Sequence, residues 1–324
     1  MRTLKDYLLL AAKGFGMGSA DVVPGVSGGT IAFITGIYEE LLNSIKSINL
    51  GTLKVLRKEG FAAAWQQING NFLVAVFVGI IVSIFSLAKA LSYLLDHHPV
   101  LLWSFFFGLI IASSIFVARQ LKNWDATKIV TLVVGAGIAY FITTLTQVET
   151  PNALWFVFIS GAIAICAMIL PGISGSFILV ILGQYAYILN SVKEFRIDVV
   201  VTFALGCVVG LLSFARLISW LFQKYHDHTI AVLTGFMIGS LNKVWPWKNT
   251  VETYQDRHGD FQPLVQENVF PGDYTTITPA EASDLGVTDK PAQVVFAVLL
   301  CLGAIALVWG LEQLGKRFSS PSKA

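Results

Sequence analysis

Pro24–Lys46, PGVSGGTIAFITGIYEELLNSIK, and Pro171–Lys193, PGISGSFILVILGQYAYILNSVK, are two copies of one pattern. They are identical at 12 of 23 aligned positions. Each copy begins with a Pro-Gly-x-Ser-Gly break between two apolar arms, within Leu8–Ile45 and Ala153–Val192. Proline removes a backbone donor and glycine loosens a helix, so the pattern predicts two helical segments interrupted at the same point.

The rest of the chain is strongly apolar. Of its 324 residues, 55% are hydrophobic and only 13% are charged, and the mean hydropathy is +0.69. A soluble fold of this length could not bury so much apolar surface. The composition excludes a soluble enzyme, a disulfide-rich secreted domain and a disordered chain, and a net charge of +2 argues against nucleic-acid binding. We therefore predict an all-α polytopic membrane protein.

Six further apolar runs approach the length of about 20 residues that a membrane-crossing helix needs. They are Asn71–Leu95, Val100–Val117, Thr127–Thr146, Val199–Phe222, Thr229–Val244 and Gln293–Leu311. The two interrupted segments differ, because a Pro-Gly break at membrane depth is tolerated only where it is buried in protein or lines a wet cavity. We expect two re-entrant helical hairpins, at 8–45 and 153–192. Short loops between complete spans are the alternative, because two crossings also return the chain to the side of the membrane from which it started.

The distribution of Lys and Arg predicts the orientation, because basic loops stay in the cytoplasm. The segment after the first hairpin is basic, with Lys46, Lys54, Arg57 and Lys58. The loop at 246–290 instead holds eight carboxylates and three Lys or Arg residues. We expect both termini in the cytoplasm and the acidic loop outside.

A weaker match extends the repeat beyond the hairpins. Gly79–Ser113 and Gly206–Ser240 are identical at 9 of 35 positions. We expect a first repeat, 1–150, and a second, 151–324, each with one hairpin and three spans. Three crossings invert the second repeat relative to the first, as in secondary transporters, whose substrate sites lie where broken helices meet. The pattern favours a transporter over a duplication that only builds a stable bundle.

The two breaks are candidate sites for a phosphate or a carboxylate, since helix N-termini offer unpaired N–H groups and partial positive charge. The candidate phosphate-binding residues are Ser27, Gly28, Gly29, Thr30, Ser174, Gly175 and Ser176. Gly and Ser also allow close helix contact, so helix packing alone is the alternative.

Lys89 and Arg216 occupy equivalent positions near the ends of two predicted spans, each in a Ser-x-Ala-Lys/Arg motif. An intramembrane cation usually marks a pathway or a partner, although it can also snorkel to the interface. We expect one cation near each mouth of a pathway for an anionic headgroup.

Three carboxylates near the first hairpin, Asp21, Glu39 and Glu40, have no acidic counterpart in the second. A buried carboxylate can carry a coupling proton. Helix capping or a pair with Lys13 is the alternative for Asp21, and an interfacial position is the alternative for the glutamates. The three cysteines lie in apolar runs without metal-ligand spacing, so we expect no metal and no cofactor.

The motifs at Asp21–Leu42, DVVPGVSGGTIAFITGIYEELL, and at 170–189, LPGISGSFILVILGQYAYIL, resemble the PopT-type polyprenyl-phosphate translocases, a bacterial membrane family. The resemblance covers nearly the whole chain. It implies a flippase in the bacterial inner membrane that returns undecaprenyl phosphate from the outer to the cytoplasmic leaflet. The lipid carrier would then be reused for peptidoglycan and other cell-envelope glycans. The implied partners are the polyprenyl phosphate and the bilayer; the coupling ion, for which a proton is one candidate, stays open.

Undecaprenyl-diphosphate phosphatases are the main alternative, because they also have inverted repeats and a PGxSR-type hairpin motif. Here Gly28 and Gly175 stand where that motif has arginine. Glu39 and Glu40 are adjacent and not at helical i, i+4 spacing. Phosphoryl transfer needs strong positive charge on the phosphate, so binding without cleavage is favoured and no catalytic residue is expected. A small-anion carrier or channel is the third alternative.

Overall fold

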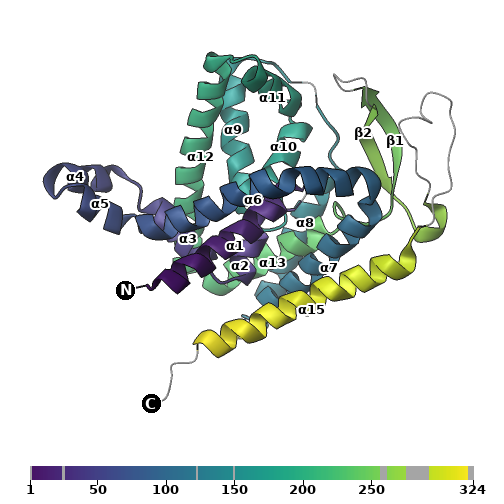
Figure 1. The fold of residues 1–324 in the computed structure, drawn as a ribbon, viewed down its shortest axis with the longest axis horizontal. Coiled ribbons are helices and arrows are strands. Elements are labelled where there is room, and N and C mark those ends of the chain that lie inside the picture. The colour runs from purple at the N-terminus through teal and green to yellow at the C-terminus, as the bar shows by residue number, and fades with distance from the viewer. Residues whose placement is uncertain are drawn as a thin grey trace.

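The computed structural model describes residues 2–23, 26–121, 123–148, 150–255, 261–274 and 292–319. These residues form a mainly helical molecule with one small sheet (Figure 1). Within them, four helices are long and apolar enough to cross a membrane. They are α6 (Gly70–His97), α7 (Pro99–Ala118), α8 (Ala126–Thr144) and α12 (Ile197–Lys224). The prediction of a helical polytopic membrane protein is confirmed, with four candidate spans, or five if one bent helix pair counts as a span.

The other two predicted spans are also helices, but they differ in length from the prediction. α13 (His226–Ser240) has 15 residues, because residues 241–244 form a turn that ends the helix early. α15 (Val294–Ser319) begins one residue after the predicted start and is apolar over Val294–Gly310. In Figure 1, α15 runs along the lower side of the bundle, beside α7.

Each interrupted segment folds into three helices. The first set is α1 (Leu4–Val22), α2 (Gly28–Ile34) and α3 (Tyr38–Lys46), and the second is α9 (Leu154–Ile169), α10 (Gly175–Ile181) and α11 (Tyr185–Lys193). The predicted Pro-Gly breaks separate the first and second helix of each set. A second break, which the sequence analysis did not predict, separates the second helix from the third. Between α10 and α11 it bends the chain by 107°.

The second break is a glycine-terminated helix end in both sets. Gly36 and Gly183 have φ of +72° and +64°, in a region that favours glycine. After α2, the Gly36 N–H donates to the Phe33 carbonyl, and the Ile37 N–H donates to the Ala32 carbonyl. The same two bonds follow α10. This Schellman arrangement satisfies the last carbonyls of each short helix.

Glycine contacts hold the first helix of each set close to a long helix. α1 runs parallel to α6, and α9 runs parallel to α12. A Cβ on any of four glycines would collide with the backbone of the neighbouring helix, so only a hydrogen permits this approach. These glycines are Gly14 and Gly79 in the first half and Gly161 and Gly206 in the second. Gly14 corresponds to Gly161 in the alignment of the two interrupted segments, and Gly79 corresponds to Gly206 in the second, weaker match.

The remaining long helices pair across the two halves. α7 lies along α15, and α8 lies along α13. Gly108 of α7 contacts the Cys301 carbonyl of α15, and Gly235 of α13 contacts the Leu132 carbonyl of α8. A helix of the first half is therefore the neighbour of a helix of the second half in both pairs.

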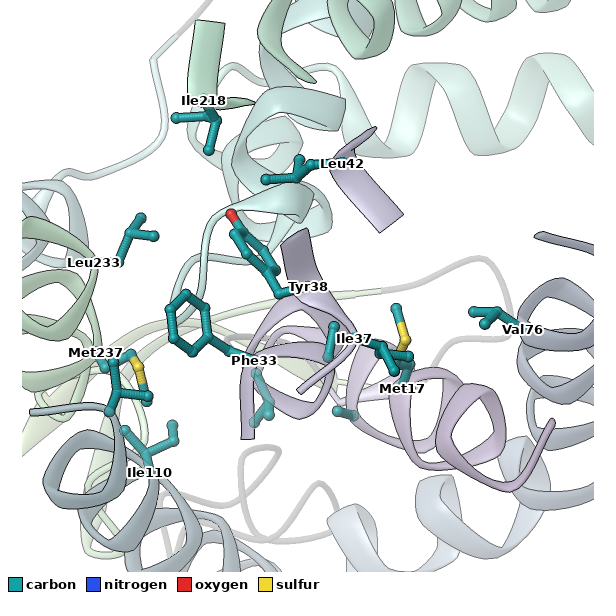
Figure 2. Packing of buried hydrophobic residues seen from close by; sticks show 14 of the residues in the cluster. Met17, Phe33, Ile37, Tyr38, Leu42, Val76, Ile110, Ile218, Leu233 and Met237 are labelled. Carbon is teal, nitrogen blue, oxygen red and sulfur yellow. The ribbon is translucent and has the colours of Figure 1, made fainter. Parts of the chain in front are cut away.

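The largest cluster of buried side chains surrounds the first interrupted segment (Figure 2). The ring centroids of Phe33 on α2 and Tyr38 on α3 are 4.9 Å apart, and Tyr38 lies 6.0 Å from Phe222 of α12. Ile110 of α7 and Met237 of α13 belong to the same cluster. The short helices α2 and α3 are therefore enclosed by longer helices from both halves.

A small sheet and two short helices lie beside the bundle (Figure 1). In the acidic loop, β1 (Lys248–Gln255) pairs antiparallel with β2 (Phe261–Asn268). The sequence analysis did not predict these strands; residues 256–260 and 275–291 of the loop lie outside the described residues. The smaller elements are α4 (Leu50–Lys58), α5 (Phe61–Gln67) and a 3₁₀ turn at Pro271–Asp273.

Candidate functional site

The two Pro-Gly breaks contact each other in the interior of the molecule. The Ser27 hydroxyl donates to the Met168 carbonyl at 3.0 Å, and the Gly172 N–H donates to the Thr30 hydroxyl at 3.1 Å. Ser27 and Thr30 are fully buried. These hydrogen bonds join residues that are about 140 positions apart in the chain. The structure thus brings together the two motifs that the sequence analysis singled out.

At the first break, the protein itself occupies the first N–H groups of α2. The Gly28 N–H donates to the Asp21 carboxylate at 2.7 Å, and the Gly29 N–H donates to the Ser27 hydroxyl at 3.1 Å. The Thr30 N–H donates to the Ser27 carbonyl. A phosphate would therefore have to displace Asp21 and Ser27 to reach these donors. The Asp21 carboxylate occupies the position in which an anion would bind.

At the second break, Met168 stands at the position equivalent to Asp21. Among the residues that the structure describes, no side chain caps the N-terminus of α10. The Ser174 and Ser176 hydroxyls lie 2.8 Å apart and share one hydrogen bond. Gly175 lies against the Ala164 carbonyl. The two breaks are thus alike in backbone form and different in charge.

Lys89 lies beyond the first break along the bundle, and its side chain is exposed. The hydroxyls of Ser19 on α1 and Ser83 on α6 are 2.8 Å apart. Because the two helices run parallel, Lys89 lies about 9 Å beyond Ser83. Val22, the last residue of α1, lies only about 4.5 Å beyond Ser19, so Lys89 extends past the end of α1.

Arg216 is placed in the same way beside the second break. The Cys166 thiol of α9 contacts the Gly210 carbonyl of α12 at 3.7 Å, and Arg216 follows six residues later. Its guanidinium is exposed and donates to the Ile48 carbonyl at 3.4 Å. Among the described residues, neither Lys89 nor Arg216 pairs with a carboxylate or contacts a break directly. The structure gives them corresponding positions around the two breaks.

The carboxylates of the first hairpin have three different environments. Asp21 caps α2, and Lys13 donates to the Thr35 carbonyl at 2.7 Å and not to Asp21. Glu40 accepts two hydrogen bonds of 2.7 Å from Arg2. Glu39 is half-exposed and lies 3.4 Å from His226. Of the three, Asp21 alone contacts a predicted break within the part of the chain that the structure describes.

Comparison of the sequence with known proteins identifies its family. The model of the VCA0040-like family, described as undecaprenyl phosphate translocase-like, matches residues 17–262. The chain belongs to this family. A polyprenyl-phosphate transporter of Vibrio cholerae serotype O1 is 48% identical over 312 residues, which cover 96% of this chain and 98% of that protein. A polyprenyl-phosphate transporter of Staphylococcus aureus is 32% identical over 253 residues, 72% of this chain and 84% of that protein. No solved structure matches the chain.

The family resemblance that the paired motifs predicted is therefore confirmed. The names of both relatives support a transporter in this translocase-like family. Within the described residues, no three His, Cys, Asp or Glu side chains form a group that could hold a metal ion.

Sequence reasoning missed two lysines that lie in this translocase-like fold beside the second break. The Lys243 ammonium is 4.3 Å from the ring centroid of Phe177 on α10, and the Lys248 ammonium is 3.9 Å from that of Trp103 on α7. Lys243 had a signal in the sequence, because it falls inside the predicted span Thr229–Val244. Lys248 had none, since it stands in a polar loop.

Proposed function

We propose that this protein is a flippase that returns undecaprenyl phosphate from the outer to the cytoplasmic leaflet of the bacterial inner membrane. The lipid carrier would be reused for peptidoglycan and other cell-envelope glycans. The observation that carries the proposal is the family match over residues 17–262, joined to the direct contact between the two broken helices. Secondary transporters bind substrate where such helices meet.

The proposed architecture is an inverted repeat of residues 1–150 and 151–324 with two re-entrant hairpins. The parallel course of α1 and α6 supports it, because the chain between them must return to the side on which α1 begins. The same holds for α9 and α12. Three crossings in each half then leave both termini in the cytoplasm and the β1–β2 hairpin outside.

Transport requires that the protein replace the hydration of the lipid phosphate. An anion alone in hydrocarbon faces an idealised cost on the order of 20 kcal/mol. We assign the replacement donors to the N–H groups and hydroxyls of the two breaks, at 27–30 and 174–176. Lys89 and Arg216, each six residues beyond a helix contact near its break, would attract the phosphate from the two sides of the membrane.

In this mechanism, Asp21 is the residue that would couple transport of the lipid to uptake of a proton. Its carboxylate holds the Gly28 N–H that a phosphate would use. A phosphate that enters the first break must move this carboxylate, and a displaced carboxylate in an apolar site takes up a proton readily. Proton uptake by Asp21 would then accompany passage of the lipid. Glu39 and Glu40 are less suited to this role, because both lie away from the breaks. Glu40 pairs with Arg2, and Glu39 lies beside His226.

The decisive experiment measures undecaprenyl phosphate at the surface of cells that lack other translocases. Cells that express this protein should clear the surface lipid, and cells with the empty vector should not. The purified protein should release no inorganic phosphate from undecaprenyl diphosphate, with or without divalent metal. Phosphate release would favour the phosphatase alternative, and uptake of free phosphate into proteoliposomes would favour a small-anion carrier.

A further inference from the structure

Lys243 and Lys248 bring two amino groups close to the second break and to the start of the small sheet. Lys243 follows α13 in a turn, and Lys248 begins β1. Both side chains are partly buried, and the Lys248 ammonium donates to the Lys243 carbonyl. Phe177, which contacts Lys243, is in the first turn of α10, directly after the hydroxyl pair at 174 and 176.

These two cations have no anionic partner in the described part of the chain. Their contacts there are two aromatic rings and one carbonyl. Burial, together with the positive charge of Lys243, lowers the pKa of Lys248 well below its ordinary value, so the charged form is disfavoured until an anion lies beside it. Removing a charge from water is costly unless a partner compensates it. An anion bound beside both ammonium groups would supply that partner.

The sequence places these two lysines in the second half and does not repeat them at the equivalent positions of the first half. At the offset that relates Gly79 to Gly206, Phe116 and Leu121 are the counterparts of Lys243 and Lys248. The cation pair therefore distinguishes one side of an otherwise repeated arrangement. In the proposed topology, that side is the outside.

An apolar pocket is lined by Asn242 and Trp245, which flank Lys243 in the chain, although neither lysine lines it. It has a volume of about 380 Å³ and is lined by residues on both sides of Lys243 in the chain and by three aromatic rings. The lining residues are Phe107, Leu241, Asn242, Trp245, Asn268, Val269 and Phe270. A pocket of this size can take the first units of a prenyl chain, whereas a free phosphate would leave it unused.

We infer that Lys243 and Lys248 form a binding site for a phosphate monoester at the outer side of the second break. Each ammonium carries three donors, so together they can hold a phosphate from two directions. The lipid identity of this ligand rests on the proposed function; the anion site itself rests on the two lysines. The site would capture the headgroup before it reaches the contact between the breaks.

Binding to the full-length protein in lipid nanodiscs tests this site. The probes are geranylgeranyl phosphate, geranylgeraniol and inorganic phosphate. We expect wild type to bind geranylgeranyl phosphate more tightly than either other probe, and Lys243→Gln with Lys248→Gln to weaken that binding about tenfold or more. Replacement of both lysines by arginine should retain most of the affinity, and Lys54→Gln on the exposed helix α4 should retain all of it.

Wild-type affinity in the double glutamine variant would overturn the site. Equal affinity for inorganic and prenyl phosphate would identify a free-anion site and overturn its assignment to the lipid. A second measurement needs no variant: geranylgeranyl phosphate should protect Lys243 and Lys248 of the wild-type protein from acylation, read by mass spectrometry. Unchanged acylation of both would also overturn the site. Lysine-dependent binding without clearance of surface lipid in cells would leave the site standing and reject the flippase.

Discussion

At the scale of single residues, the two breaks differ most at Asp21. This carboxylate binds the first N–H of α2, whereas Met168 takes the equivalent place before α10. A carboxylate repels a phosphate that approaches the same donors, unless it moves away or takes up a proton. In the proposed mechanism, Asp21 is thus the residue that links proton uptake to the substrate charge.

The first prediction is that Asp21→Asn uncouples transport from the proton gradient. The asparagine oxygen can still accept from the Gly28 N–H, so the first break keeps its form, but the side chain can no longer take up a proton. Clearance of surface undecaprenyl phosphate should become insensitive to a protonophore in this variant. Asp125→Asn, at the N-cap of α8, is the control and should keep wild-type sensitivity. Equal sensitivity of Asp21→Asn and wild type would reject the coupling role.

The second prediction concerns Lys89 and Arg216. Arg216→Gln should strongly reduce clearance of the surface lipid at matched protein levels, because the positive charge is lost. Arg216→Lys should keep part of the activity, since the charge remains and the fork of donors does not. Lys89→Gln should also reduce clearance, with a larger effect on capture from the outer leaflet. If both neutral variants clear the lipid at the wild-type rate, these side chains only snorkel.

At the scale of elements, the short helices depend on two glycines that turn the chain. Gly36 and Gly183 both end a helix with positive φ, but their surroundings differ. No atom of the described residues lies within 4 Å of a Cβ added at Gly36, whereas a Cβ at Gly183 would lie 2.6 Å from the Val148 carbonyl. Backbone strain is therefore the only cost at Gly36, and a steric clash is added at Gly183.

The third prediction follows from this difference. Gly36→Ala should lower the free energy of unfolding in detergent by about 1–2 kcal/mol, the cost of the left-handed conformation. Gly183→Ala should lower it further. Gly137→Ala, in the interior of α8 with open space around it, is the control and should stabilise the protein by about 0.5–1 kcal/mol. The order of the three variants in chemical or thermal unfolding checks the argument, and an unaltered Gly183→Ala would contradict it.

The same elements show what sequence alone could predict. Long apolar runs predicted the long helices, because the requirement to cross a membrane acts on each run separately. The Pro-Gly breaks could also be predicted, because proline and glycine interrupt a helix through local effects. The turn at Gly36 was not predicted, since one glycine among apolar residues does not reveal its φ. The contacts of Ser27 with Met168 and of Lys243 with Phe177 depend on tertiary structure, and no local pattern carries them.

At the scale of the whole molecule, the two halves are interleaved and not merely joined. α7 packs on α15 and α8 packs on α13, so each half covers a helix of the other. The break contacts lie inside this arrangement. In the proposed inverted repeat, these shared contacts would link a movement of one half to the other, as alternating access requires.

The last prediction concerns the sidedness of this arrangement. If α1 and α6 start on the same side, α4 lies in the cytoplasm with the N-terminus, and the odd number of later crossings places the β1–β2 hairpin outside. A cysteine at Gln266 of β2, exposed in the structure, should react with an impermeant thiol reagent applied to intact cells. One at Lys54 of α4 should react only after the membrane is opened. The three native cysteines are first replaced by alanine, and activity is checked in that background. Labelling of Lys54→Cys in intact cells to the same extent as Gln266→Cys would reject the inverted repeat, because α4 and the hairpin would then share one side.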